Sequence, residues 1–376
     1  MPLDVQLAKR LPEFTLDVSF SSGDGSLSVL GSSGAGKSML LRCIAGLDRP
    51  DRGRIVLNGR VLFDTQRGIQ LPARERRVGM LFQHYTLFPH WTLGENIAFG
   101  IRHLPQEEQA SRVTALLQRT HIAGLEHRYP REVSGGEQQR AALARALAIE
   151  PEALLLDEPL SALDTHLRSQ MEAQLQETFA AYPRPALLVT HNIEEAYRLG
   201  EQLLVVSHGR VAAFGAKDAI FRSPPTLEVA RLTGCKNFSR VRLLSENKVE
   251  ALDWNCTLGV SRVTQRSPAY AGIRAHHIEI TSSPSIEVGG QENIFPCWLM
   301  RSSETPFRMT LYLSLHQPPG APPGIISGTT FGEASGTAAG YSLQAEVTKE
   351  KWLRFRDRPF PWHVRLAPDS LFLMPE

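Results

Sequence analysis

The sequence feature that most constrains the fold is a glycine-rich segment between an apolar run and a helical pattern. Residues 31–38 read GSSGAGKS and fit the pattern GxxxxGK[ST] at every fixed position. Glycines at this spacing let backbone N–H groups converge on phosphate oxygens at a helix N-terminus. In this pattern Lys37 reaches the β- and γ-phosphates, and the Ser38 hydroxyl ligates Mg²⁺. The predicted phosphate-binding residues are Gly31, Ser32, Ser33, Gly34, Ala35, Gly36, Lys37 and Ser38.

Short apolar runs alternate with helical patterns as far as about Thr233. The runs are Leu27–Leu30, Ala153–Leu156, Ala186–Val189 and Leu203–Val206. Continuous apolar strands between helices are typical of a sheet that is buried on both faces. We therefore predict an α/β fold of the P-loop NTPase class with a mainly parallel sheet.

The pattern changes after Thr233, where helical periodicity fades and short alternating segments appear. Examples are Met309–Leu315 and Ser342–Val347, while residues 316–324 read HQPPGAPPG and predict a loop. We expect two domains, residues 1–235 and a smaller all-β domain at residues 236–376. The sequence shows no long repeat.

Charge and composition exclude several classes of protein. Lys plus Arg number 41 and Asp plus Glu 39, so a net charge of +2 gives no electrostatic reason to expect a nucleic-acid partner. No apolar stretch reaches the length of about 18 residues that a spanning helix requires, and Met1–Arg10 has no export pattern. We expect an intracellular protein that serves a membrane, if at all, by docking. The four cysteines are scattered and predict neither disulfides nor a zinc site.

Two acidic residues end the apolar run Ala153–Leu156. Ligands of parallel sheets bind at the carboxyl ends of the strands, where Asp157 and Glu158 are expected. Asp157 is predicted to hold Mg²⁺, and Glu158 to polarise a water that attacks the γ-phosphate. Taken alone, this pattern is equally typical of an ordinary acidic strand end; the glycine-rich loop favours the functional interpretation.

A third segment, residues 133–140, reads VSGGEQQR. Ser134 and Glu137 have the S-x-x-E spacing of a capping box that opens the helical run Ala141–Ala148. A cap does not require Gly135 and Gly136, whereas glycines there clear the approach of a phosphate to the helix N-terminus. Both interpretations are compatible, because a capped helix start is also an anion site.

These three segments, in this order, resemble the ATP-binding subunit of ABC transporters, and the resemblance covers residues 1 to about 235 and implies a helical subdomain within them. Residues 31–38 resemble the Walker A motif, Asp157 and Glu158 the end of Walker B, and residues 134–138 the LSGGQ signature, with Glu137 in place of glutamine. By the same resemblance, Gln83 is the Q-loop glutamine, residues 161–164 (SALD) form the D-loop, and His191 is the switch histidine.

The resemblance implies the roles of these residues. The implied catalytic residues are Glu158, His191, Gln83 and Lys37. The implied nucleotide contacts beyond residues 31–38 are Ser134, Gly135, Gly136, Glu137 and Asp164. The implied Mg²⁺ ligands are Ser38, Gln83 and Asp157. An aromatic residue usually stacks on adenine in this family, and Phe14 is the nearest candidate, although it is equally a candidate core residue.

The resemblance also implies partners. Each ATP in this family lies between the Walker A of one subunit and the signature of another, so a dimer of two chains with two ATP molecules is expected. Permease subunits in the membrane and, indirectly, an external binding protein complete such a complex, at whose cytoplasmic face the chain is expected. Tyr85–Gly100 resembles the importer segment that receives a coupling helix of the permease; internal packing of its aromatic residues is the alternative.

Three further segments resemble the molybdate importer subunit and, less closely, the sulfate one. They are Asn58–Leu62, Arg76–Gly79 and Val211–Gly215. Import of molybdate is therefore expected, with sulfate or thiosulfate, ferric iron or polyamine as alternatives, and a soluble ABC ATPase outside transport as a different class.

The C-terminal region shows a looser resemblance. Gly272–Ile278 resembles the start of the OB-like MOP/TOBE module of such importers, which in some members binds oxyanion; an oxyanion here is one possibility that the resemblance leaves open. His276 and His277 are not expected to bind metal together, because adjacent strand residues face opposite sides.

Overall fold

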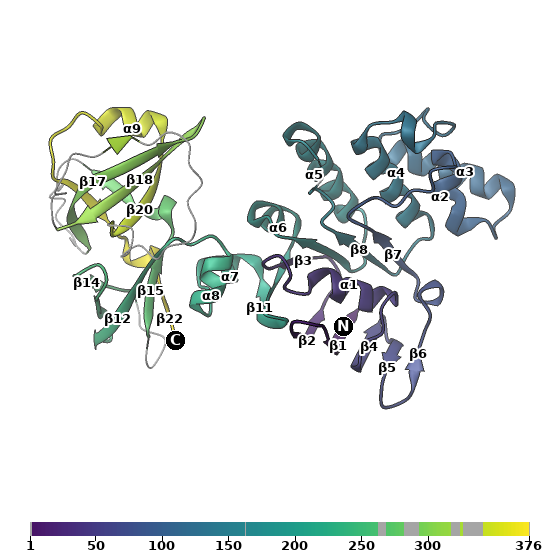
Figure 1. Ribbon diagram of the computed structural model, residues 1–376, viewed down its shortest axis with the longest axis horizontal. Helices are drawn as coiled ribbons and strands as arrows, with labels where there is room; N and C mark the ends of the chain where they lie inside the picture. The colour runs from purple at the N-terminus through teal and green to yellow at the C-terminus, as the bar shows by residue number, and fades with distance from the viewer. Residues whose placement is uncertain are drawn as a thin grey trace. The chain divides into compact units, whose positions relative to one another are not determined.

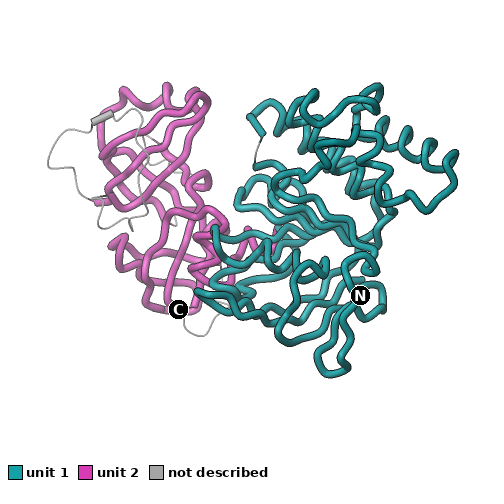
Figure 2. Tube along the Cα trace, turned by 45° about the vertical axis from the view of Figure 1, so that its right-hand side comes forward, with its two compact units in different colours: residues 1–217 teal, residues 218–376 magenta. Residues whose placement is uncertain are grey.

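The computed structural model describes residues 2–161, 163–261, 268–281, 293–316, 324–325 and 341–375. The chain divides into two compact units, residues 1–217 and 218–376 (Figure 2). The division falls at the start of helix α7 (Lys217–Arg222), whereas the sequence placed the domain boundary after α8 (Leu227–Leu232). The predicted fold class, an α/β part followed by a β part, is confirmed. Most of the loop predicted at residues 316–324 lies outside the described residues.

Unit 1 is built on an 11-stranded sheet with the order β6-β5-β4-β1-β2-β11-β10-β3-β9-β8-β7 (Figure 1). The strands are β1 (Leu3–Arg10), β2 (Thr15–Ser22), β3 (Ser26–Leu30), β4 (Arg52–Leu57), β5 (Arg60–Asp64), β6 (Ile69–Gln70), β7 (Val78–Leu81), β8 (Ala153–Asp157), β9 (Ala186–Thr190), β10 (Gln202–Ser207) and β11 (Arg210–Ala216).

The four predicted apolar runs lie in neighbouring strands of one half of this sheet. Strands β10, β3, β9, β8 and β7 pair in parallel, and every residue of β3, β8 and β9 is buried. Successive residues of β8 enter opposite cores: Leu155 packs on the α1 side, and Leu154 and Leu156 pack on the α4 side. Both faces are therefore apolar, which is why the runs are continuous.

The other half of the sheet is antiparallel. Strands β1, β2, β4, β5 and β6 pair as antiparallel neighbours, and β11 joins the two halves, since it pairs in parallel with β2 and antiparallel with β10. The sheet is therefore mixed. The burial pattern of β2 alternates, with Leu16, Val18 and Phe20 buried between exposed residues. Such alternation is typical of a strand with one face toward the core.

Helices cover the parallel strands, and three of them group beside β7 and β8 (Figure 1). The helices of unit 1 are α1 (Lys37–Ala45), α2 (Leu93–Ala98), α3 (Gln106–Arg119), α4 (Gly135–Ala148), α5 (Thr165–Ala180) and α6 (Ile193–Leu199). The group of α2, α3 and α4 matches the predicted helical subdomain. Within the described part of the chain, no helix has both the length and the apolar character needed to span a membrane.

Unit 2 contains two sheets. One has the order β14-β13-β12-β15-β22, and the other has the order β16-β21-β17-β18-β20, with β19 (Gly324–Ile325) paired to β17. The strands of the first are β12 (Asn237–Ser245), β13 (Lys248–Ala251), β14 (Cys256–Gly259), β15 (Tyr270–Ile273) and β22 (Leu371–Met374). Those of the second are β16 (Glu279–Thr281), β17 (Ile294–Glu304), β18 (Arg308–Leu315), β20 (Leu343–Thr348) and β21 (Trp362–Arg365), and helix α9 (Lys349–Phe355) follows β20.

Two buried asparagines make matching hydrogen bonds in the two sheets. Asn237 opens β12; its side-chain amide donates to the carbonyls of Ile273 and Gln344, and its oxygen accepts from the Gln344 N–H at 2.6 Å. Asn293 precedes β17; its side-chain amide donates to the carbonyls of Leu366 and Gly259, and its oxygen accepts from the Gly259 N–H at 2.6 Å.

The correspondence extends to the chain around these residues. Ile273 ends β15 and Leu366 directly follows β21, and each is followed by a short 3-10 turn, at Ala275–His277 and Pro368–Ser370. After its turn each half continues into the other sheet: β16 pairs with β21, and β22 pairs with β15. Unit 2 is therefore built from two interlocked halves, a structural repeat that the sequence did not reveal.

Replacing either asparagine should destabilise unit 2 by a similar amount. Asn237→Ala removes the side-chain partner of the Gln344 N–H and carbonyl, while the Ile273 carbonyl keeps the Cys235 thiol as a donor. Asn293→Ala removes the side-chain partner of the Gly259 N–H and of the Gly259 and Leu366 carbonyls. Each buried group left unsatisfied costs about 1–3 kcal/mol of unfolding free energy. Urea unfolding of the full chain measures the loss, with Lys248→Ala, at an exposed position of β13, as the control. A midpoint unchanged from the wild type in either variant would contradict the proposed bridging role.

Candidate functional site

The predicted phosphate loop lies between β3 and α1, and its lysine is buried. The Lys37 side chain, 5% exposed as a residue, donates from Nζ to the carbonyls of Gly31 and Ser32, both at 2.8 Å. Burial lowers the pKa of Lys37, while the carboxylates of Glu158 and Asp157 act in the opposite direction. The loop therefore holds a desolvated cation at the start of a helix, the arrangement that a bound phosphate requires.

Glycine is required at Gly36, the N-cap of α1. Its φ of 95° lies in the left-handed region that residues with a Cβ rarely adopt. A Cβ at this position would also come within 3.3 Å of the Phe14 ring. The loop can therefore turn into α1 beside that ring only because no side chain is present.

The end of strand β8, at Asp157, contacts the phosphate loop through a hydrogen bond from Ser38. The Ser38 hydroxyl donates to Oδ1 of Asp157 at 2.8 Å, across 119 positions of sequence. Asp157 is the last residue of β8 and is 7% exposed, and burial raises its pKa despite the bond from Ser38. A hydroxyl and a carboxylate that already converge are oxygen ligands of the kind that Mg²⁺ prefers, so these residues fit the implied ion.

Glu158 and His191 face one another across the ends of two neighbouring strands. Nδ1 of His191, which follows β9, lies 3.2 Å from Oε2 of Glu158, which follows β8. Glu158 has a φ of 44°, a conformation uncommon for a residue with a side chain. The Glu158 N–H donates to the carbonyl of Val189 at 3.0 Å, and this bond from β9 holds the turn in place.

These residues line one pocket of about 540 Å³. Its walls combine the loop, the two strand ends and Gln83, which follows β7, with an apolar side that the sequence did not assign. The lining residues are Leu11, Phe14, Ser33, Gly34, Gly36, Lys37, Ser38, Met39, Gln83, Glu158 and His191. The structure thus brings together the Walker A, Q-loop and switch residues with Glu158, and Asp157 contacts them through Ser38.

Phe14 lies where either of the two roles considered for it, core packing or contact with adenine, is possible. It is half-buried against the sheet core, and it also lines the pocket. Its ring packs so closely on Gly36 and Gly209 that a Cβ at either glycine would contact it. An exposed ring face beside the phosphate loop is suited to stacking on a nucleobase.

The predicted signature residues lie elsewhere. Ser134 caps α4 with Glu137: the Ser134 N–H donates to the Glu137 carboxylate at 2.8 Å, and the Glu137 N–H donates to the Ser134 hydroxyl at 3.3 Å. Ser134 and Gly135 are exposed, and Asp164 caps α5 through the Leu167 N–H. The described residues that line the pocket include neither Asp164 nor any residue of Ser134–Glu137. One chain therefore does not assemble all of the implied nucleotide contacts.

An aromatic cluster of Phe88, Trp91 and Phe99 lies in the segment Tyr85–Gly100. The ring centroids are 4.6–5.5 Å apart, and the Arg102 guanidinium lies 4.0 Å above the Trp91 ring. Phe88 and Phe99 are 36% and 47% exposed. Internal packing therefore does not cover these rings fully.

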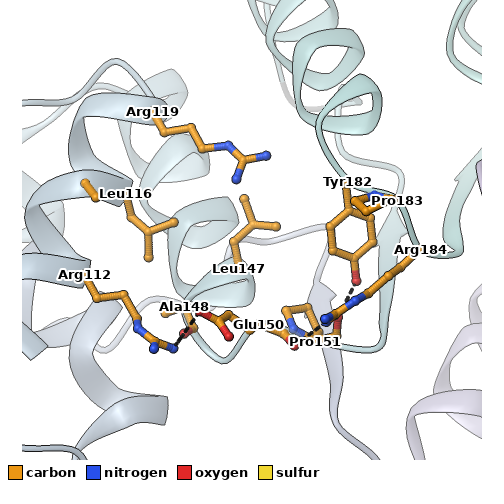
Figure 3. A pocket seen from close by; sticks show the side chains of 11 residues that line it. Arg112, Leu116, Arg119, Leu147, Ala148, Glu150, Pro151, Tyr182, Pro183 and Arg184 are labelled. Atoms are coloured by element: carbon orange, nitrogen blue, oxygen red, sulfur yellow. Dashed lines mark hydrogen bonds and ion pairs between the residues drawn. The ribbon is translucent and has the colours of Figure 1, made fainter. Parts of the chain in front are cut away.

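A further pocket, of about 320 Å³, lies between α3, the end of α4 and the loop Tyr182–Arg184 (Figure 3). The Tyr182 hydroxyl and the Arg184 guanidinium both donate to the carbonyl of Pro151 at 2.7 Å. None of the predicted site residues lines it. These bonds join the α5–β9 loop to the end of the helical group.

A family profile described as ABC transporter matches residues 16–161. The sulfate/thiosulfate import ATP-binding protein of Ralstonia nicotianae is 38% identical over 301 residues, which cover 74% of this chain and 78% of that protein. The corresponding protein of Synechocystis is 42% identical over 58% of this chain and 61% of its own length.

The molybdenum import ATP-binding protein of Paramagnetospirillum magneticum is 40% identical over 59% of this chain and 61% of its own length. The matches thus span about three fifths of the length of the Synechocystis and Paramagnetospirillum proteins. A solved ATP-binding cassette, described as a dimer in a post-hydrolysis state bound to ADP and phosphate, matches 57% of this chain and 98% of its own, with 27% identity and a TM-score of 0.49.

Removal of the buried cation should weaken nucleotide binding. Lys37→Met deletes the ammonium that faces the phosphate loop, and a hydrogen bond to a charged group contributes about 1.5–3 kcal/mol, or roughly ten- to a hundredfold in Kd. Titration of the full chain with a fluorescent ATP analogue and Mg²⁺ measures the loss. Lys217→Met is the matched control, because this ammonium also donates to a carbonyl, that of Tyr197, away from the pocket. Equal affinity in both variants would exclude the assigned role of Lys37.

Proposed function

The chain belongs to the family of ABC transporter ATP-binding proteins, and from this premise we propose that it binds and hydrolyses ATP to energise the import of an oxyanion. The observation that supports the proposal is the convergence of Lys37, Ser38, Glu158 and His191 on one pocket. Lys37 and Ser38 begin α1, whereas Glu158 follows β8 and His191 follows β9, and a structural role alone does not require these three segments to meet.

In the proposed reaction the chain's own residues act on the terminal phosphate and on water. Lys37 and the N–H groups of the loop bind the phosphates, and the exposed face of Phe14 stacks on adenine. Glu158 accepts a hydrogen bond from the attacking water and orients it, while His191 contacts the γ-phosphate. Ser38, Asp157 and Gln83 would hold Mg²⁺, which would supply positive charge to the phosphate oxygens.

We propose that two copies of the chain share two ATP molecules. The pocket of one copy lacks the signature, and Ser134 and Gly135 are exposed at the N-terminus of the 14-residue helix α4. A helix N-terminus with free N–H groups is suited to receive the γ-phosphate bound by the partner copy. The differential contacts of that phosphate then favour the closed dimer, and hydrolysis releases it.

The proposed membrane partner is a permease that docks on the aromatic cluster of Phe88, Trp91 and Phe99. Aromatic rings and arginine dominate the energy of protein interfaces, and Arg102 lies on the same surface. Asn96, which is fully buried, exchanges hydrogen bonds with Phe88 and holds the segment in shape. The chain would then act at the cytoplasmic face of the membrane, with an external binding protein as an indirect partner.

The proposed cargo is an oxyanion, with molybdate and sulfate as the two candidates. The segments Asn58–Leu62, Arg76–Gly79 and Val211–Gly215 favour molybdate, while the relatives described above include both sulfate/thiosulfate and molybdenum import proteins. Ferric iron and polyamine, which are cations, are the alternative cargoes within the class of import ATPases. A soluble ABC ATPase outside transport is the alternative class, and co-purification with ribosomes or DNA instead of a permease would favour it.

Substitution of Glu158 tests the hydrolytic role. Glu158→Gln keeps the size and the hydrogen-bonding capacity of the side chain but removes the charge that polarises water, so kcat should fall by about 10²–10⁴-fold. ATP binding should persist, and a dimer should accumulate in size-exclusion chromatography with MgATP. Glu152→Gln, outside the pocket, is the control. Normal turnover by Glu158→Gln would refute the role.

Uptake measurements distinguish the cargo. In cells that lack this chain, molybdate uptake should be lost and should return when the chain is supplied, but not when the Glu158→Gln variant is supplied. Sulfate and thiosulfate are measured in the same cells. Loss of sulfate uptake alone would assign sulfate as the cargo, and unchanged uptake of all three ions would reject oxyanion import.

A further inference from the structure

A buried carboxylate that the proposed reaction does not use lies one helical turn after His191. Glu195 is in the first turn of α6 and is 6% exposed. Its Oε2 accepts a hydrogen bond from the Thr190 hydroxyl at 2.6 Å. The same hydroxyl accepts from the Asn192 N–H at 3.0 Å. The Thr190 hydroxyl therefore links the residue before His191 to the backbone N–H of the residue after it. Glu195 fixes the orientation of that hydroxyl.

The other oxygen of Glu195 faces helix α5. Nε of Arg168 lies 3.9 Å from Oε1 of Glu195 and has no hydrogen-bond partner among the described residues. A second nitrogen of the same guanidinium donates to the carbonyl of Leu163 at 3.3 Å. Arg168 therefore joins the predicted D-loop to Glu195, and Glu195 joins the turn of His191 through Thr190.

The pKa of Glu195 depends on both of its contacts, Thr190 and Arg168. Burial raises the pKa of Glu195, while the hydrogen bond from Thr190 and the charge of Arg168 oppose the shift. A displaced Arg168 would leave the carboxylate with less compensation, and a buried charge without compensation is costly. A movement of the backbone at Leu163 therefore changes the environment of the group that holds the His191 turn.

We propose that Glu195 is a positioning residue through which the D-loop of a chain sets the placement of its own His191, with Arg168 and Thr190 as its two contacts. The inference rests on the proposed function, because the placement of His191 matters only if that residue contacts the γ-phosphate. It extends that function, because the D-loop, which the family resemblance implies to contact a second copy, is connected to the pocket of its own chain through these contacts. ATP hydrolysis then depends on the conformation of the D-loop.

A purely structural role of the ion pair is the alternative, and the chain offers a matched control. Arg198 of α6 pairs with Glu172 of α5 at 3.3 Å, so this pair joins the same two helices. Glu172 is largely shielded, with 13% of its side chain exposed. Within the described part of the chain, neither Arg198 nor Glu172 makes a hydrogen bond or ion pair with the D-loop or the His191 turn, although the charge of Glu172 contributes to the raised pKa of Glu195.

The experiment compares Glu195→Gln, Arg168→Gln, their combination and the control Glu172→Gln in the full chain. For each variant, kcat and KM for MgATP are measured together with Tm. Glu195→Gln retains an acceptor for Thr190, so the fold should persist. Because misplacement of a reacting group by about 1 Å can cost up to 10²-fold in rate, we expect kcat to fall about tenfold or more in both single variants, with KM within twofold of the wild type.

The combination and the control decide between the two roles. If the residues act as one link, the double variant should lose no more kcat than the worse single variant, because the two effects are not additive within one network. Arg168→Lys should restore part of the loss, and Glu172→Gln should keep wild-type kcat even where its Tm falls as much as that of Glu195→Gln. If Glu195→Gln does not fold, the comparison of Arg168→Gln with Glu172→Gln supplies the same test.

Each result has one meaning. A kcat within twofold of the wild type in both single variants, or an equal loss in Glu172→Gln, would overturn the positioning role while leaving the proposed function intact. A wild-type chain without MgATP hydrolysis, alone or with its permease, would overturn the proposed function and this inference with it.

Discussion

The hydrogen bond between Ser38 and Asp157 depends on the parallel pairing of three strands, and the rest of the pocket depends on the same pairing. Strands β3, β9 and β8 are neighbours in the sheet, so their carboxyl ends meet at one edge. The phosphate loop follows β3, His191 follows β9, and Asp157 and Glu158 end β8. Residues 119 positions apart can meet there because no antiparallel strand separates them. The buried apolar faces of these strands fix their register, and the register places the polar groups.

The local motifs could be predicted from the sequence, and the contacts between distant segments could not. The loop around Lys37, the strand end at Asp157 and the cap at Ser134 are each encoded within about eight residues. Phe14 lines the pocket because Gly36 and Gly209 admit its ring, a packing relation between three separate segments. The contact of Arg168 with Glu195 joins two helices and gives no signal in a single sequence. A half-buried aromatic residue just before an alternating strand was the available clue to Phe14.

The same distinction applies to the fold. Continuous apolar runs predicted the parallel half of the sheet, because burial on both faces removes polar alternation. The antiparallel half has one-sided strands such as β2, whose alternating pattern was present in the sequence but was not interpreted. In unit 2 the repeat is invisible in the sequence because it depends on Asn237 and Asn293, each of which recognises the backbone of a strand in the other half. A backbone hydrogen bond places almost no demand on the side chain at the accepting position.

Glu137 occupies the position of the glutamine in the LSGGQ signature, and this difference has a physical consequence. Glu137 satisfies the Ser134 N–H and hydroxyl at the start of α4, and its negative charge suits the positive end of the helix. A γ-phosphate that approaches the same terminus meets that charge, whereas a glutamine would offer a neutral amide. Because Ser134 and Gly135 are exposed, water screens the repulsion until a second copy covers the site, and the repulsion strengthens as water leaves. The carboxylate therefore stabilises the helix in the single chain, and in the proposed dimer it would oppose closure around ATP, so that closure would depend more heavily on the other proposed phosphate contacts, those of Lys37 and His191.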